Sequence, residues 1–156
     1  MSRTTRATQA LDRAGVAYEV HTYAYDPSAG RVGLHAAESL GVSPGIVLKT
    51  LMILLDGKPV CAVIPSDREV SMKRLAAALK GKSAEMMKPA DAERLTGYRI
   101  GGISPFGQKR SVPTVMERDA LTLERVFLNG GQRGVQVAGA PEAFLAALRA
   151  VAASIA

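Results

Sequence analysis

Lys49 is the residue whose type and position most clearly suggest chemistry. It lies near the start of an apolar stretch, residues 47–55. Lysine is almost never fully buried without a partner, so its ammonium group must reach a pocket or the end of a strand, or pair with an acid. In a pocket it could hold a phosphate or polarise a carbonyl group. The alternative is a lysine whose aliphatic stem follows the strand and whose head reaches solvent.

A glycine-rich segment at residues 101–107 is a second candidate. Glycines let the main chain approach a ligand closely, and backbone N–H groups in such a loop can bind an anion or an oxyanion. The segment lacks the Gly-Lys-Ser/Thr ending of a P-loop, so ATP binding is not predicted. The alternative is a plain connection, although long glycine-rich loops in small domains are more often functional. Its members are Gly101, Gly102, Ile103, Ser104, Pro105, Phe106 and Gly107.

His21 and Tyr23 lie two residues apart in a predicted strand and therefore point to the same face. They could form the polar wall of a cleft. A structural role is the alternative for His21. The chain has two histidines and one cysteine, and none of them has zinc-finger spacing. No metal site and no cofactor are expected.

The sequence offers no clear protein nucleophile. Cys61 stands between Val60 and Ala62 in a predicted buried strand, where a free cysteine behaves as a small apolar residue. A reactive thiol needs a partly exposed, electropositive setting. The chain also has no G-x-S-x-G nucleophile motif.

Basic residues accompany the glycine-rich segments. Lys109 and Arg110 follow the first segment, and Arg133 lies in a second one, residues 129–134. They could contact RNA phosphates, which position a nucleic acid without reading its sequence. The whole chain carries 20 Lys and Arg against 14 Asp and Glu, a net charge of +6, which favours a polyanionic partner. A solvated rim and solubility are the alternatives.

The hydrophobic pattern predicts the elements that position these residues. An Asp56-Gly57 turn should join strands 47–55 and 60–64 into a hairpin. Ser71 is a good N-cap for a helix that ends at Gly81, and Pro141 should open a final helix. The stripe of this last helix is expected to be Phe144, Leu148, Val151 and Ile155. Other helices are expected at residues 4–14, 33–40 and 89–96, and other strands at residues 16–23, 112–116, 123–128 and 135–138.

Regular alternation of strands and helices is missing, which argues against a doubly wound parallel sheet. The predicted fold class is α/β (α+β), with a mixed β-barrel-like core and surrounding helices. We find no repeat and no break in composition, so residues 1–156 are expected to form a single domain.

A cytoplasmic location is expected. No apolar run reaches the roughly 18 residues that a membrane-spanning helix needs. The basic N-terminus, which begins at Met1, is not followed by an apolar region, so no secretory signal is predicted. A single cysteine cannot form an internal disulfide.

Four stretches of the chain resemble the YbaK/EbsC family of aminoacyl-tRNA deacylases, which are relatives of the editing domain inserted in bacterial prolyl-tRNA synthetase. The resemblance covers nearly the whole chain and implies the mixed barrel-like fold. Within the family, the pattern is most similar to the Cys-tRNA(Pro) deacylase subgroup. The stretches are His21-Thr22-Tyr23 with Asp26-Pro27, Lys49-Thr50-Leu51, Gly97-Tyr98 with residues 101–109, and residues 130–134.

The resemblance implies roles for individual residues. Lys49 matches a family lysine beside the terminal adenosine of the tRNA and its phosphate, and residues 101–105 match a Gly-x-x-x-Pro loop around the aminoacyl group. Val32 stands where relatives often carry Phe, and Tyr25 replaces a common His. The catalytic set is then Lys49, Gly101, Gly102, Ile103, Ser104 and Pro105. The substrate-binding set is His21, Tyr23, Val32, Thr50, Phe106, Gly130, Gly131 and Arg133, and the tRNA contacts are Lys109 and Arg110.

The implied function is trans-editing of Cys-tRNA(Pro). The substrate's own thiol attacks its ester carbonyl and forms a cyclic thiolactone, so no protein nucleophile is needed. The implied partners are the acceptor end of aminoacyl-tRNA and prolyl-tRNA synthetase in a ternary complex; neither DNA nor a membrane is expected. The alternatives are a deacylase for another small amino acid, such as Ala-tRNA(Pro), a non-catalytic tRNA- or synthetase-binding module, and a metal-dependent hydrolase.

Overall fold

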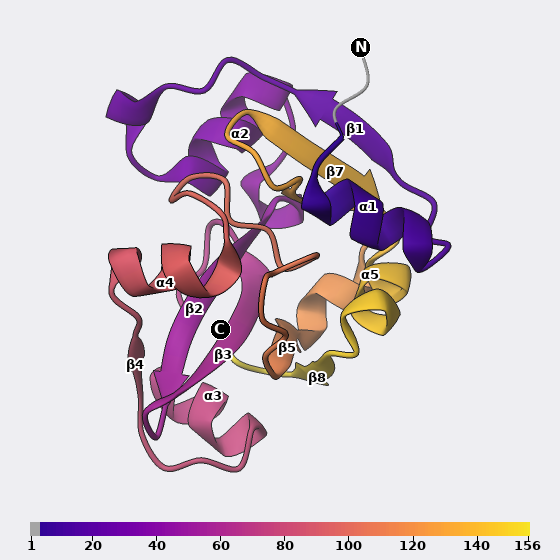
Figure 1. Cartoon of the computed structure of the whole chain (residues 1–156). Helices are drawn as coiled ribbons and strands as arrows, with labels where there is room; N and C mark the ends of the chain where they lie inside the picture. The colour runs from indigo at the N-terminus through magenta and orange to yellow at the C-terminus, as the bar shows by residue number, and fades with distance from the viewer. Residues whose placement is uncertain (1–3) are drawn as a thin grey trace.

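Two β-sheets with helices around them form the structure, a computed structural model that describes residues 4–156 (Figure 1). The prediction about a secretory signal depends in part on residues 1–3, which lie outside the described part. The helices are α1 (Arg6–Arg13), α2 (Val32–Leu40), α3 (Met72–Ala78), α4 (Pro89–Thr96) and α5 (Pro141–Leu148). The strands are β1 (Glu19–Thr22), β2 (Leu48–Leu55), β3 (Lys58–Pro65), β4 (Ala84–Met86), β5 (Thr114–Glu117), β6 (Val126–Asn129), β7 (Val135–Gly139) and β8 (Val151–Ala153).

The larger sheet has the strand order β4-β2-β3-β5-β8, and the smaller sheet has the order β1-β7-β6. The larger one is mixed, since β2 pairs antiparallel with β3 and β4, whereas β5 lies parallel to β3 and β8. A parallel bridge between Val47 and Phe127 joins the two sheets. The mixed fold class is confirmed, and the strands form two open sheets that meet at this bridge.

The β2–β3 hairpin confirms the expected turn. Asp56 and Gly57 both have positive φ, 51° and 80°, as a tight two-residue hairpin turn requires. The Asp56 carboxylate accepts hydrogen bonds from the backbone N–H groups of Lys82 and Ser83. The turn is therefore fixed to the segment that leads into β4.

Helices from both ends of the chain share the main core. Leu11 of α1 and Phe144 of α5 are fully buried in one apolar cluster with Met52 of β2. α2 covers the smaller sheet through Ala36 and Ala37, and α3 packs on the larger sheet through Leu75. In the described part of the chain, no helix is long and apolar enough to span a membrane.

The prediction for the C-terminal region is wrong in part. α5 ends at Leu148, Arg149 adopts the left-handed conformation, and β8 then pairs in parallel with β5. The expected stripe is divided, because Phe144 packs in the main core and Ile155 in a separate cluster on the other face of the larger sheet. A helical spacing of apolar residues cannot reveal that pairing with a distant strand will interrupt it.

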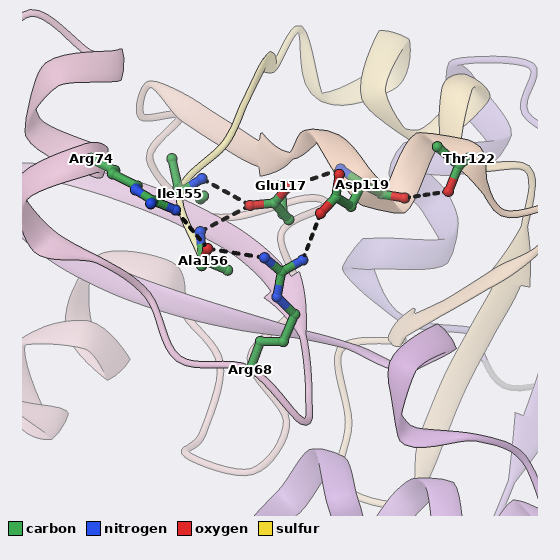
Figure 2. A network of polar contacts seen from close by, with 7 residues as sticks. All are labelled: Arg68, Arg74, Glu117, Asp119, Thr122, Ile155 and Ala156. Atoms are coloured by element: carbon green, nitrogen blue, oxygen red, sulfur yellow. Dashed lines mark hydrogen bonds and ion pairs between the residues drawn. The ribbon is translucent and has the colours of Figure 1, made fainter.

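A buried carboxylate holds this C-terminal segment in place (Figure 2). Glu117, at the end of β5, is fully buried and accepts hydrogen bonds from the N–H groups of Ile155, Ala156 and Asp119, at 2.8–2.9 Å. Arg68 and Arg74 both donate to the backbone oxygen of Ala156. Burial alone would raise the pKa of Glu117, but the three backbone N–H donors and the Arg68 guanidinium outweigh burial and lower the pKa.

Smaller differences concern strand ends. β1 begins at Glu19 rather than at residue 16, and β6 begins at Val126 rather than at residue 123. A short 3-10 helix, Arg118–Thr122, precedes β6, and the three-residue strand β4 was not predicted. The strand β4 exists because it pairs with the distant strand β2, and such a pairing is not encoded in local sequence patterns.

Candidate functional site

A cavity of about 310 Å³ lies beside β2. β4 pairs with β2 only from Ile53 to Leu55, and the cavity occupies the adjoining part of the strand, residues 48–52. Because this site is at a strand edge, consecutive residues of β2 can line it although their side chains alternate between the two faces of the sheet. The other lining residues are Val32, Gly33, Met86, Met87, Pro89, Ala92, Ile100, Gly101, Ile103, Asn129 and Gln136.

Among the described residues that line this cavity, Lys49 alone carries a charge. It also lines a second cavity of about 330 Å³, which lies at the start of α2 beside Arg31, Asp67 and Glu69. Burial lowers the pKa of Lys49, Glu69 and Asp67 act in the opposite direction, and Arg31 adds to the decrease. Within residues 4–156, its ammonium group forms neither a hydrogen bond nor a close ion pair. Lys49 is thus a half-buried cation that is available to a ligand.

The first part of the glycine-rich loop forms a wall of the cavity and requires glycine. Gly101 has φ +92°, and a Cβ atom there would lie 2.6 Å from the Tyr25 hydroxyl. A Cβ on Gly102 would lie 2.9 Å from the backbone nitrogen of Arg133. The two glycine-rich segments therefore pack directly against each other.

Asn129 connects these two segments. Its Nδ2 donates to the backbone oxygen of Gly101 at 3.1 Å, and its Oδ1 accepts from the N–H of Gly131 at 2.7 Å. Arg133 adds a hydrogen bond from Nε to the backbone oxygen of Ile100 at 2.8 Å. Asn129 was not predicted as a site residue. Its position before a glycine pair was interpreted only as part of a turn.

The second part of the loop turns into the core. Ser104 is fully buried, and its hydroxyl accepts a hydrogen bond from the N–H of Phe106 at 3.2 Å. The Phe106 ring packs on Phe144, with the ring centroids 5.1 Å apart, and its backbone oxygen accepts from the Tyr98 hydroxyl. Pro105 and Phe106 line a separate cavity of about 220 Å³. Of the residues predicted in this loop, only Gly101 and Ile103 line the main cavity.

A row of polar residues crosses the smaller sheet next to the cavity. The strand register places His21 opposite Gln136, and Gln136 opposite Asn129. Directly opposite residues of antiparallel strands share a face. Gln136, on the central strand β7, is one of the residues that line the cavity. Gln136 was missed as a candidate, although a glutamine between Val135 and Val137 in a buried strand is unusual.

Two polar atoms at the cavity have no hydrogen-bond partner among the described residues. They are Gln136 Oε1 and Thr50 Oγ1, and Gln136 is only 2% exposed. Buried polar atoms are normally paired, so each unpaired one requires an explanation. Both residues line the cavity, so a ligand bound there could supply the missing hydrogen-bond donor.

His21 and Tyr23 share the face of Gln136 but do not line the cavity. The His21 ring makes an edge contact with Phe127, and its Nε2 lies 3.7 Å from a Glu19 carboxylate oxygen. The Tyr23 hydroxyl is buried without a hydrogen bond of normal geometry. Burial raises the pKa of Tyr23, and the neighbouring Gln136 amide partly offsets this. Both side chains are thus neighbours of Gln136 rather than lining residues of the cavity.

The other predicted residues occupy four positions. Val32 and Thr50 line the main cavity, whereas Gly131 donates its N–H to Asn129 and Gly130 donates its N–H to the backbone oxygen of Val135. Arg133 stacks on Tyr25, with its guanidinium 5.2 Å from the ring centroid. Lys109 and Arg110 are exposed on the surface.

Neither a metal centre nor an activated thiol emerges from the described residues. No group of three or more His, Cys, Asp or Glu side chains in residues 4–156 could hold a metal ion. Cys61 is 1% exposed, and burial raises its pKa to about 12. A thiol in this state is a poor nucleophile at neutral pH. The site therefore offers a cation, backbone groups and polar acceptors around an apolar space.

Comparisons with known proteins identify a family with this architecture. A family model described as an aminoacyl-tRNA editing domain matches residues 33–147. EbsC of Enterococcus faecalis, named as a candidate Cys-tRNA(Pro)/Cys-tRNA(Cys) deacylase, is 37% identical over 145 residues, which cover 90% of this chain and 86% of EbsC. A proline–tRNA ligase of Nitratidesulfovibrio vulgaris is 37% identical over 79 residues, 48% of this chain but 14% of the ligase.

A solved structure has the same fold. It is described as a candidate trans-editing enzyme for prolyl tRNA synthetase, and it matches with a TM-score of 0.83 at 22% identity over 99% of this chain and 98% of its own. The structural match supports the fold, and the family model and EbsC support the activity. The chain belongs to the aminoacyl-tRNA editing domain family, as its resemblance to the YbaK/EbsC proteins predicted, and is an aminoacyl-tRNA deacylase.

Proposed function

We propose that this deacylase removes cysteine from mischarged Cys-tRNA(Pro) in trans. The observation that carries the proposal is a small cavity in which Lys49 is the single charged lining residue among residues 4–156 and whose walls include Met52, Met86 and Met87. An apolar, sulfur-rich wall suits a small and polarizable side chain. EbsC, whose name gives the same substrate class, supports the choice of amino acid.

The proposed chemistry uses the substrate's own nucleophile. The cysteine sulfur attacks the ester carbonyl, a C–S bond forms, and the C–O bond to the terminal ribose breaks. The thiol proton passes to the departing ribose oxygen, and the cyclic thiolactone is then hydrolysed to cysteine. Lys49 stabilises negative charge on the reacting ester, and the loop beginning at Gly101 holds the acyl group. Holding thiol and carbonyl within reach can supply several of the roughly 7–11 kcal/mol available from proximity.

We assign the remaining predicted residues by their positions. Val32 and Thr50 contact the acyl group, and Ile103 belongs to the same wall. Gly102, Ser104, Pro105 and Phe106 shape the loop, while Gly130, Gly131 and Arg133 support it. His21 and Tyr23 act behind Gln136, and exposed Lys109 and Arg110 contact tRNA phosphates.

The proposed context is a ternary complex with tRNA(Pro) and prolyl-tRNA synthetase in the cytoplasm, with residues 1–156 acting as one domain. The likeness to a segment of a proline–tRNA ligase supports this partner. Leu11 and Phe144, from opposite ends of the chain, share one core and support the single domain. The proposed reaction needs neither a metal nor an organic cofactor.

Release of labelled cysteine from Cys-tRNA(Pro), measured beside release of alanine from Ala-tRNA(Pro), tests the function. We expect fast loss of cysteine, retention of alanine, and no effect of a metal chelator. Faster loss of alanine would move the specificity to another small amino acid, and the first residue to test would be Val32, which stands where relatives often have Phe. Salt-sensitive tRNA binding without release of either amino acid would indicate a binding module.

A further inference from the structure

We propose that Gln136, assisted by Thr50, recognises the α-amino group of the aminoacyl moiety and so determines which acyl esters are cleaved. The inference rests on the proposed deacylase function and goes beyond it by assigning a specificity-determining residue. Its starting point is the pair of unpartnered acceptors at the cavity, Gln136 Oε1 and Thr50 Oγ1.

The position of Gln136 is built into the fold. Its backbone is held on both sides, by β1 opposite His21 and by β6 opposite Asn129. Its side chain is 98% buried, since only 2% remains exposed, yet its amide oxygen has no partner in the described part of the chain. A buried acceptor without a hydrogen bond is costly, and an apolar residue there would avoid this cost. The Gln136 amide already neighbours the Tyr23 hydroxyl, and a donor from the substrate would complete its hydrogen bonding by pairing the amide oxygen.

The cavity leaves few other acceptors for such a donor. Asn129 Oδ1 is already occupied by the N–H of Gly131, and its Nδ2 by the oxygen of Gly101. The Lys49 ammonium group can only donate. Among the lining side chains of the described residues, Gln136 and Thr50 therefore supply the free oxygen acceptors.

The chemistry of the ligand identifies the group they bind. In an aminoacyl ester the carbonyl and ester oxygens only accept, and a thiol is a weak donor that an apolar wall tolerates. Within the acyl group the α-amino group is the one strong donor, whether neutral or protonated, and the neighbouring ribose hydroxyl is common to every ester compared. Because Lys49 can interact with the ester oxygens, the amine is left to face Gln136 and Thr50. An acyl group without the amine would leave both acceptors unpaired.

A substrate that lacks only the amine tests this assignment. The probes are Cys-tRNA(Pro) and tRNA(Pro) acylated with 3-mercaptopropionate, which keeps the thiol and the ester. Each rate is divided by the spontaneous rate of the same ester. For the wild-type protein we expect a loss of about tenfold on removal of the amine, the size of one or two hydrogen bonds. For Gln136→Met we expect about the same loss with Cys-tRNA(Pro) and no further loss with the desamino ester.

The matched control is Gln9→Met, the same change on the exposed side of α1, which should leave both rates unchanged. Thr50→Val provides a second variant with the same expected pattern, in case Gln136→Met does not fold. If Gln136→Met slows both esters equally, or if the wild-type protein cleaves both equally well, the inference is overturned while the deacylase function stands. If the wild-type protein cleaves neither ester, the proposed function itself fails.

Discussion

Buried polar groups are treated differently in two regions of this molecule. At the C-terminal edge, the buried Glu117 carboxylate accepts three backbone hydrogen bonds, and Arg68 lies next to it (Figure 2). At the cavity, Lys49 has no close partner, and Gln136 Oε1 and Thr50 Oγ1 have none among the described residues. The first region satisfies its charge internally, whereas the second leaves polar atoms free.

The difference separates stability from function. A buried charge with full hydrogen bonding stabilises the fold only as long as every partner is present, because removing one leaves the others unpaired. Unpaired groups around a cavity reduce stability, and ligand binding can offset that cost. Substitutions at Glu117 should therefore lower the free energy of unfolding and leave the deacylation rate unchanged. Substitutions at the cavity should lower the deacylation rate and leave the free energy of unfolding unchanged or higher.

Lys49→Met should give the largest effect. Removal of the cation should lower kcat/KM for aminoacyl-tRNA roughly 100- to 1,000-fold, the usual effect of losing a group that stabilises a developing charge. Stability should stay the same or rise, because burial disfavours the charged form of Lys49 in the folded state. Single-turnover deacylation and urea unfolding measure the two effects.

Lys58→Met, at the exposed start of β3, is the matched control and should change neither quantity. Near-normal activity of Lys49→Met would remove Lys49 from the mechanism. If the free energy of unfolding fell by as much as the activation free energy rose, Lys49 would act, like Glu117, mainly in stabilising the fold.

Glu117→Gln should destabilise the protein by about 3 kcal/mol, because the charge is lost and the amide brings buried donors against backbone N–H groups. The deacylation rate of the folded fraction should stay unchanged. The pKa of Glu117 lies below its ordinary value of 4.5, so its stabilisation is fully present above that pH and is lost as the pH falls through the folded-state pKa. Urea unfolding between neutral and acidic pH should show this loss in the wild-type protein and a weaker one in the variant. If Glu117→Gln were as stable as the wild-type protein, the stabilising role assigned to the Glu117 network would be wrong.

Local patterns predicted the parts of the site that lie within one segment. The β2–β3 hairpin, the position of Lys49 and the close approach at Gly101 follow from apolar runs, turn residues and glycine. Gln136 and Asn129 were missed, because their meaning depends on the register between strands β1, β7 and β6. A cross-strand row unites residues more than 100 positions apart, which no periodicity within one segment can indicate.

The direction of a loop side chain is equally hard to predict. The resemblance predicted that the backbone of residues 101–105 surrounds the aminoacyl group, but it did not indicate that the Ser104 side chain turns inward and accepts a hydrogen bond from the N–H of Phe106. That geometry depends on Phe144 and Tyr98, which pack against the loop from other elements. The same limitation explains the C-terminal region, where pairing with β5 overrode a helical pattern.

Cys61 is a third kind of buried titratable group, because it belongs neither to the Glu117 network nor to the residues that line the cavity. Its pKa is 9.0 ordinarily and about 12 in the folded protein. The folded state keeps a proton that the unfolded chain loses, so this stabilisation is complete below pH 9 and declines as the pH rises toward 12. Between pH 8 and pH 10, the wild-type protein should lose about 1.4 kcal/mol more than Cys61→Ala. If the free energy of unfolding changed with pH in the same way for the wild-type protein and Cys61→Ala, the raised pKa of Cys61 would be contradicted. The pKa of Tyr98 is also raised to about 12, but Tyr98 is present in both proteins and contributes equally to each.

Lys109→Ala and Arg110→Ala should give the smallest effects, since both side chains are exposed and lie outside the cavity and the Glu117 network. Each should weaken tRNA binding about two- to fivefold and lower the salt dependence of binding by about one unit of slope, without changing the rate at saturation. Filter binding over a range of salt concentrations measures both. Arg94→Ala, which removes an exposed cation paired with Asp91, is the control and should change neither. A lower rate at saturating tRNA would show that Lys109 or Arg110 takes part in the reaction, and would contradict the assignment of the chemistry to the cavity alone.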